Sequence, residues 1–296
     1  MSTKTYRGNC HCGAFVYEVD LPEIKSVLEC PGSLCFKKGA LLVQASSIRV
    51  EKGSEGALTT YKAKDSDYSH LSAELTYPWF CPTCGSQVFG KTNGSAPKSY
   101  ALNHRVFQAS RSPAYTTISR SQAACSEPAR VPPTYSGPAP KFDQEGSKLY
   151  TGSCHCGAVT LGLKSKTIDQ NCVGDEETPG ILECNCSICK RSGNLWMYVP
   201  EKQVELQGRQ NLTQYLFGYK LLTRPFCKTC GVHPISEWRD IPADELSAVP
   251  EESREYREAS LGFCAVNLRI LDNFSLDGLV INHWDGEKNG APYINP

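Results

Sequence analysis

Three short cysteine-containing blocks occur twice in this chain, in the same order, and no other feature restricts its fold as strongly. The blocks are GNCHCGA (8–14) and GSCHCGA (152–158), LEC (28–30 and 182–184), and FCPTCG (80–85) and FCKTCG (226–231). Blocks that recur in a fixed order indicate a duplicated structural unit. We therefore expect two copies of one domain in tandem.

The chain of 296 residues is long enough for two domains of ordinary size, and its 40% hydrophobic content can fill two modest cores. We expect a first domain over 1–107 and a second over 148–296. The segment between them, 108–147, is rich in Pro and Ser and poor in large apolar residues. This composition is typical of an extended linker, or of a proline-rich ligand for a partner domain.

Short β-rich runs follow the cysteine blocks in both copies, and Gly, Pro and Asn separate them. This pattern predicts short strands. The exception is 242–260, a charged run in the second copy alone, which predicts a helix. We expect a mainly β fold with a short helical insertion in the second domain, and the insertion is either solvated or a lid over a site.

The first and third blocks of each copy contribute four cysteines. They are Cys10, Cys12, Cys81 and Cys84 in the first copy and Cys154, Cys156, Cys227 and Cys230 in the second. A C-x-C pair and a distant C-x-x-C pair can close a tetrahedral shell around one zinc ion, and binding to such a site contributes to folding. We expect two structural zinc sites, with disulfides or free thiols as the alternative.

A different group, Cys184, Cys186 and Cys189, offers only three thiols within the stretch ECNCSICKRSG. Catalytic zinc sites keep three protein ligands and leave the fourth position to water or substrate. The following Lys190 and Arg191 supply positive charge that favours thiolates. The alternative is a closed site completed by a fourth protein ligand, for which the candidates are Cys172, Cys264, His155 and His233.

The first copy provides an internal comparison for this triad. It has Cys30 and Cys35 at the corresponding positions, but Gly32 stands where Cys186 stands. Two thiolates rarely hold zinc firmly, so we expect that the first copy has lost this site, although metal binding by Cys30 and Cys35 is left open. A block that is dispensable for folding in one copy favours a functional role for the triad in the other.

Composition excludes several classes of protein. The 31 basic residues balance 31 acidic ones, and no Lys/Arg run is present, which disfavours nucleic-acid binding. No apolar run approaches the ~20 residues needed to cross a bilayer, and the N-terminus lacks the apolar core of a signal peptide. We expect a soluble, cytoplasmic protein, and in a reducing compartment 16 clustered cysteines favour metal over disulfides.

Over 5–107 and 148–285 the chain resembles two glutathione-dependent formaldehyde-activating (GFA) domains, the family that includes centromere protein V. The resemblance rests on G-x-C-x-C-G, C-x-C-x-x-C and C-x-x-C-G. It implies an Mss4-like fold of small, strongly bent antiparallel sheets, with a structural zinc on Cys154, Cys156, Cys227 and Cys230 and a second zinc on the triad. It also implies carbon–sulfur lyase activity that joins or releases an aldehyde and glutathione.

The leading hypothesis is therefore a zinc-dependent carbon–sulfur lyase that works through Cys184, Cys186 and Cys189, with a small-molecule substrate and glutathione as candidate co-substrate. His233 is a candidate for proton transfer or a packed histidine, and Trp196, Tyr198 and Asn267 either line the pocket or belong to the core. The alternatives are a zinc-dependent hydrolase, decarboxylase or dehydratase, and a non-catalytic zinc module. The substrate and the oligomeric state are left open.

Overall fold

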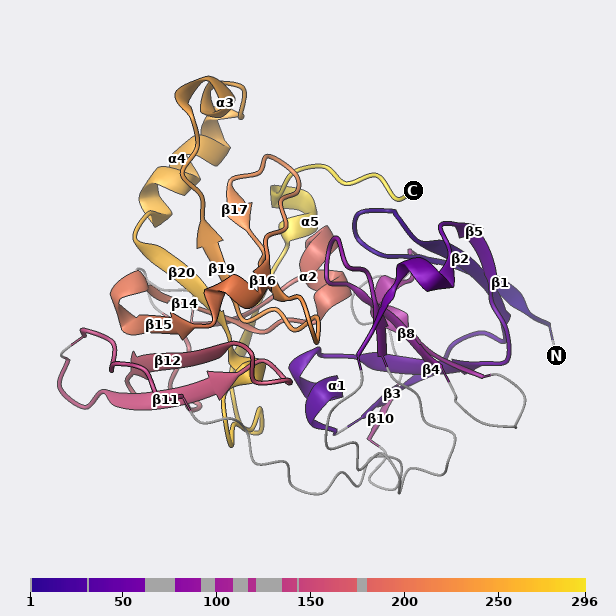
Figure 1. Cartoon of the computed structure of the whole chain (residues 1–296), viewed down its shortest axis with the longest axis horizontal. Coiled ribbons are helices and arrows are strands. Elements are labelled where there is room, and N and C mark those ends of the chain that lie inside the picture. Colours follow the sequence, from indigo (N-terminus) through magenta and orange to yellow (C-terminus); the bar gives the residue numbers. More distant parts are fainter. Residues whose placement is uncertain are drawn as a thin grey trace.

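The computed structural model describes residues 2–30, 32–61, 78–91, 99–108, 117–120, 135–142, 144–174 and 180–296. These residues form small sheets joined by short loops and a few short helices (Figure 1). The predicted mainly β fold is confirmed. No helix in this part of the chain is both long enough and apolar enough to cross a bilayer.

The first copy contains two sheets, with strand orders β1-β2-β5 and β10-β3-β4-β9-β8-β7-β6. Its strands are β1 (Lys4–Asn9), β2 (Val16–Leu21), β3 (Ser26–Glu29), β4 (Leu41–Ala45), β5 (Arg49–Lys52), β6 (Thr59–Thr60), β7 (Pro78–Phe80), β8 (Gln87–Lys91), β9 (Tyr100–Asn103) and β10 (Thr117–Arg120). Its helical turns are α1 (Ser33–Lys37), η1 (Glu55–Ala57) and η3 (His104–Val106).

The second copy repeats this arrangement with sheets β11-β12-β15, β17-β19-β20-β14-β13-β21 and β16-β18. Its strands are β11 (Lys148–Ser153), β12 (Thr160–Ser165), β13 (Ile181–Cys184), β14 (Trp196–Pro200), β15 (Val204–Gln207), β16 (Leu212–Thr213), β17 (Leu222–Thr223), β18 (Phe226–Cys227), β19 (Ile235–Trp238), β20 (Phe263–Asn267) and β21 (Ile281–Trp284). Its helical elements are α2 (Ser187–Ser192), η4 (Glu201–Gln203), η5 (Arg209–Asn211), α3 (Ala243–Ser247), α4 (Glu251–Ser260), η6 (Leu268–Ile270) and α5 (Gly286–Asn289).

Equivalent strands pair in the same way in the two copies. β1 with β2 and β11 with β12 form antiparallel ladders of equal length. β3 and β13 each accept a parallel strand, β10 in the first copy and β21 in the second. These ladders therefore have the same construction, as the repeated cysteine blocks predict, although β16-β18 is a separate sheet in the second copy and its counterpart β6-β7 belongs to the large sheet of the first.

Most of the predicted linker, 108–147, lies outside the described residues. Of the described parts, Thr117–Arg120 pairs with β3. Tyr135 is buried, its hydroxyl donates to the Pro138 carbonyl at 2.7 Å, and its ring lies against Gly162 of β12. These parts of the segment therefore pack on the two copies.

The insertion predicted as one helix over 242–260 contains two, α3 and α4. Pro250 separates them, because proline lacks an amide hydrogen and disfavours helical geometry in the residue before it. No residue of either helix is buried, as expected for a solvated insertion. Tyr256 of α4 nevertheless packs edge-on against Trp238 of β19, with ring centroids 5.9 Å apart.

The two copies pack tightly against each other through matching residues. His11 contacts the hydroxyl oxygens of Ser187 and Tyr215 in the second copy, at 2.9 and 2.6 Å. In the reverse direction, His155 contacts Ser33 and Tyr61 in the first copy, at 2.9 and 3.0 Å. One hydrophobic cluster contains residues of both copies. The copies therefore share one core.

Glycines allow the backbones of the two copies to meet beside this core. Gly39 follows α1, with φ +53°, and a Cβ there would lie 2.2 Å from the carbonyl oxygen of Gly193. Gly193 follows α2, with φ +62°, and a Cβ there would lie 2.6 Å from the carbonyl oxygen of Gly39. A side chain at either position would force the copies apart.

We predict that Gly39→Ala destabilises the protein much more than Gly278→Ala. Gly278 also has positive φ, +78°, but a Cβ there meets nothing within 4 Å. Both variants carry the strain of alanine at positive φ, about 1–2 kcal/mol. Only Gly39→Ala adds the clash between the copies, about 1–3 kcal/mol more. Thermal unfolding of the two variants measures the difference, and equal losses would show that the interface tolerates the side chain.

Candidate metal centres

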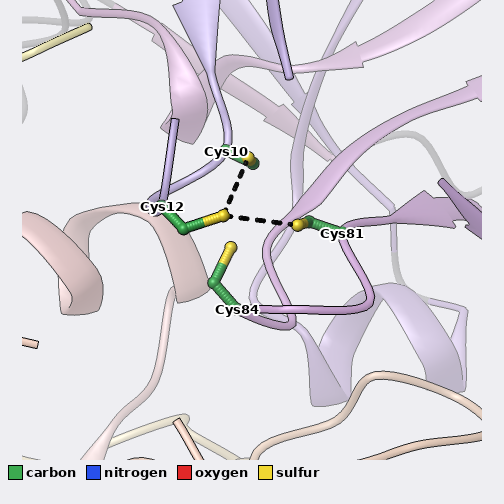
Figure 2. Close-up of side chains that lie close together, drawn as sticks. All are labelled: Cys10, Cys12, Cys81 and Cys84. Carbon is green, nitrogen blue, oxygen red and sulfur yellow. Dashed lines mark hydrogen bonds between the residues drawn. The ribbon is translucent and has the colours of Figure 1, made fainter. Parts of the chain in front are cut away.

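The first copy brings the sulfurs of Cys10, Cys12, Cys81 and Cys84 together. Two of these cysteines follow β1 and two follow β7, and Figure 2 shows the four side chains converging. The Cys12 sulfur lies 3.6 Å from those of Cys10 and Cys81, and all four sulfurs lie within 4.8 Å of one another. Tetrahedral zinc with bonds of ~2.3 Å places its sulfurs about 3.8 Å apart. The four side chains therefore suit a zinc ion.

The second copy forms the same cluster from Cys154, Cys156, Cys227 and Cys230. The Cys156 sulfur lies 3.5 Å from those of Cys154 and Cys227, and all four cysteines are free thiols. Backbone amides support the sulfurs: Phe15 donates to Cys10 and Val159 donates to Cys154, both at 3.3 Å. Both predicted sets of four ligands are thus assembled by equivalent loops.

The sulfurs of Cys184, Cys186 and Cys189 also lie within 4.8 Å of one another. Cys184 ends β13, Cys186 is the N-cap of α2, and Cys189 lies inside that helix. Hydrogen bonds from Cys184 and Cys189 hold the pKa of Cys186 well below its usual range. Cys189 is buried, whereas Cys184 and Cys186 are half-buried.

Within the described ranges, no fourth histidine, cysteine or acidic residue joins the triad. The four candidates lie elsewhere: the Cys172 thiol donates to the Thr167 carbonyl, and His155 bonds to Ser33 and Tyr61 of the first copy. Cys264 of β20 lines a separate cavity of about 340 Å³.

The fourth candidate, His233, packs between the copies. A Cβ on Gly85 would lie 2.7 Å from its Nε2, and its ring contacts that of Phe226. Burial and the charges of Lys38 and Arg224 lower the pKa of His233 to about 3. The ring is therefore neutral near pH 7, and its packing against Gly85 and Phe226 between the copies fits the packed-histidine alternative.

The indole of Trp196 supports the triad from β14. Its Nε1 donates to the Cys189 sulfur at 3.2 Å, and the Arg224 guanidinium lies 4.8 Å from its ring centroid. Burial alone would lower the pKa of Arg224, but the sulfurs of the triad and the Tyr198 hydroxyl raise it above the usual range. Tyr198 is half-buried and points to the same face of β14 as Trp196, because alternate strand residues share a face.

Asn267 does not belong to this group. Its side-chain oxygen accepts from the amides of Leu195 and Arg269, and its side-chain nitrogen donates to the His233 carbonyl. These bonds tie together three backbone segments. Asn267 is therefore a buried structural residue, and Trp196 and Tyr198 are the members of the predicted set that lie by the triad.

The C-terminal segment covers the triad loop, which sequence reasoning missed. A Cβ on Gly286 would lie 2.6 Å from the Cys184 sulfur. Asn185, between two of the cysteines, donates to Asp285 and accepts from the Glu287 amide, both at 2.9 Å. Glycine at 286 is required by this approach, but such a long-range contact leaves no local signal in the sequence.

The first copy lacks an equivalent of the triad among the described residues. Cys30 is disulfide-bonded, so its sulfur is not available as a thiolate, and Gly32 is the N-cap of α1 where Cys186 is the N-cap of α2. The residues around the triad differ as well: Leu42, Gln44 and Pro78 stand where the second copy has Trp196, Tyr198 and Arg224. We infer that this copy holds no open metal site.

A family model described as glutathione-dependent formaldehyde-activating enzyme matches residues 5–118 and 149–251. These stretches make up most of the chain, and the chain therefore belongs to this family, as the resemblance predicts. Among solved structures, a crystal structure of a Rhodobacter sphaeroides protein is similar at 24% identity, with a TM-score of 0.32. The match covers 45% of this chain and 99% of that one.

We predict that Cys186→Ser removes one metal ion and leaves both copies folded, whereas Cys227→Ser unfolds the second copy. The first change leaves two thiolates beside an intact framework, and the second opens a buried cluster whose metal binding contributes to folding. Metal analysis and circular dichroism of both variants measure these effects. If both variants lose structure equally, the triad is a structural site.

Proposed function

We propose that this protein is a zinc-dependent carbon–sulfur lyase that joins or releases a thiol, glutathione in the first instance, and an aldehyde through its second copy. The observation that carries the proposal is the gathering of three sulfurs with no fourth protein donor among the described residues. Family membership supports the use of glutathione and formaldehyde. The catalytic unit would be Cys184, Cys186 and Cys189.

The three thiolates would hold a zinc ion that, when bound, acts as a Lewis acid toward a thiol or a carbonyl oxygen. In the direction of synthesis, the thiol loses its proton, sulfur attacks the carbonyl carbon, and the carbonyl oxygen takes up a proton. Trp196 donates to the Cys189 sulfur and thereby fixes its orientation. Burial of Trp196 and Cys189 excludes water from the inner side of the site.

The two four-cysteine clusters would hold structural zinc and have no part in turnover. Their closed ligand sets leave no position for a substrate. The substrates would be small molecules. A reducing compartment such as the cytoplasm would keep the triad thiols free, and it would also reduce the disulfide bond of Cys30.

Turnover can be tested with the zinc-loaded full chain, glutathione and formaldehyde, following formation of the thiol adduct by exchange NMR. We expect catalysis above the spontaneous rate, lost in Cys189→Ser. Cys35→Ser is the matched control, because Cys35 is the counterpart of Cys189 in the first copy, and it should retain activity. Turnover of a carbonyl compound without any thiol would instead favour the hydrolase, decarboxylase or dehydratase alternative.

The triad and the four-cysteine clusters should lose their zinc to a chelator at different rates. A three-thiolate site leaves one coordination position of its ion open, whereas four sulfurs complete the shell of the others. We predict that a mild chelator removes about a third of the bound zinc first, and that activity falls in step with this fraction while the fold persists. Loss of activity only together with the tightly bound zinc would contradict the assignment.

A further inference from the structure

Arg224 is a buried cation beside the triad, and among the described residues two of its nitrogen atoms find no hydrogen-bond acceptor. Its side chain is 5% exposed, and its guanidinium lies over the indole of Trp196, which itself donates to Cys189. Its Nε and Nη1 atoms have no hydrogen-bond partner. Within the described part of the chain it forms no salt bridge with a carboxylate. Leaving such a group desolvated and unpaired is costly.

Buried arginines in the described part of the chain are satisfied to different degrees: Arg269 also has an unpaired Nε atom, whereas Arg191 is fully engaged. Arg191 donates to the carbonyl oxygens of Asn9 and Ser187 and to the side-chain oxygen of Asn295. Each nitrogen of its guanidinium therefore donates to an oxygen atom of the protein. Arg224, in contrast, leaves Nε and Nη1 without a partner, and it lies within electrostatic range of the three sulfurs.

Arg224 differs between the two copies, as the triad does. This comparison associates Arg224 with the triad and not with the residues that the fold needs. Several residues that join the copies are retained in both, as the pairs His11/His155, Ser33/Ser187, Tyr61/Tyr215, Gly39/Gly193 and Phe80/Phe226 show. The first copy has lost the third cysteine of the triad, and it has Pro78 in place of Arg224. The first copy therefore contributes its half of the shared core without an arginine at this position.

The charges of the site favour an anionic ligand. Three thiolates and one divalent ion carry a net charge of −1, and Arg224 restores neutrality. An anion can then enter without facing uncompensated negative charge. Among anions, a carboxylate matches the planar fork of a guanidinium and accepts two parallel hydrogen bonds from it.

We propose that Arg224 binds a carboxylate of the substrate, so that the natural thiol or thiol adduct carries a carboxylate near its sulfur. This inference rests on the proposed function, since it assumes that the sulfur of the substrate approaches the triad. Arg224 would then select the substrate and orient it, with Trp196 holding the guanidinium in place.

Two small thiols that differ in one group provide the test. The full chain is loaded with cobalt(II), and mercaptoacetate or 2-mercaptoethanol is titrated while the cobalt absorption bands are followed. The wild type should bind mercaptoacetate about ten- to one-hundredfold more tightly, the range for a charged hydrogen bond. Arg224→Gln should abolish this preference, and Arg224→Lys should retain part of it, because lysine keeps the charge without the fork.

Arg209→Gln is the matched control, because Arg209 is exposed and already paired with Glu237. It should leave the preference unchanged. The metal content of the four-cysteine clusters shows whether each variant is folded. If Arg224→Gln is not folded, the affinities of Arg224→Lys for the two thiols decide the question. An equal affinity for both thiols in the wild type, or a preference that survives both changes at Arg224, overturns the inference alone. If neither thiol alters the cobalt spectrum, the triad has no free position and the proposed function fails as well.

Discussion

The two copies hold each other through a reciprocal set of side-chain contacts. Each C-x-C pair contains a histidine that reaches a serine and a tyrosine of the other copy. Burial and the nearby Arg191 lower the pKa of His11 to about 3, so this ring is a neutral hydrogen-bonding group near pH 7. Because the histidine is flanked by two cysteines of a cluster, the cluster and the interface hold each other in place.

Charge is shared across the same interface. A closed four-thiolate zinc site carries a net charge of −2, which is costly to bury without nearby cations. Each copy places a cationic side chain beside the cluster of the other copy. Arg191 of the second copy lies within electrostatic range of Cys10 and Cys84, and Lys38 of the first copy lies within range of Cys227 and Cys230. Each copy therefore compensates the cluster of its partner.

Duplication accounts for the contrast between the two triad positions. Residues at the interface serve both copies, so their loss from either one would weaken the whole protein. Gly32, Leu42 and Pro78 do not have this double role, and they differ from their counterparts Cys186, Trp196 and Arg224. The first copy thus retains what the shared core needs and has lost what surrounds the sulfur triad.

The sequence predicted the cysteine clusters well because their ligands come in pairs separated by one or two residues, a local signal that repeats. It also predicted the strand-rich architecture and the triad as a group. It did not reveal the break at Pro250 within the expected helix, although proline is a signal for one. The contact of Gly286 with Cys184 joins residues far apart in the chain, so no local pattern could indicate it. Arg224 was visible as a difference from Pro78, but its meaning required its position over Trp196.

The covalent connection between the copies has a consequence for their association. Two separate chains with this interface would dissociate on dilution, and any change in one would appear in both. Within a single chain, the effective concentration of one half around the other does not depend on the amount of protein. A partner that is always present allows one half to specialise as scaffold, so the two triad positions can diverge without loss of the shared core.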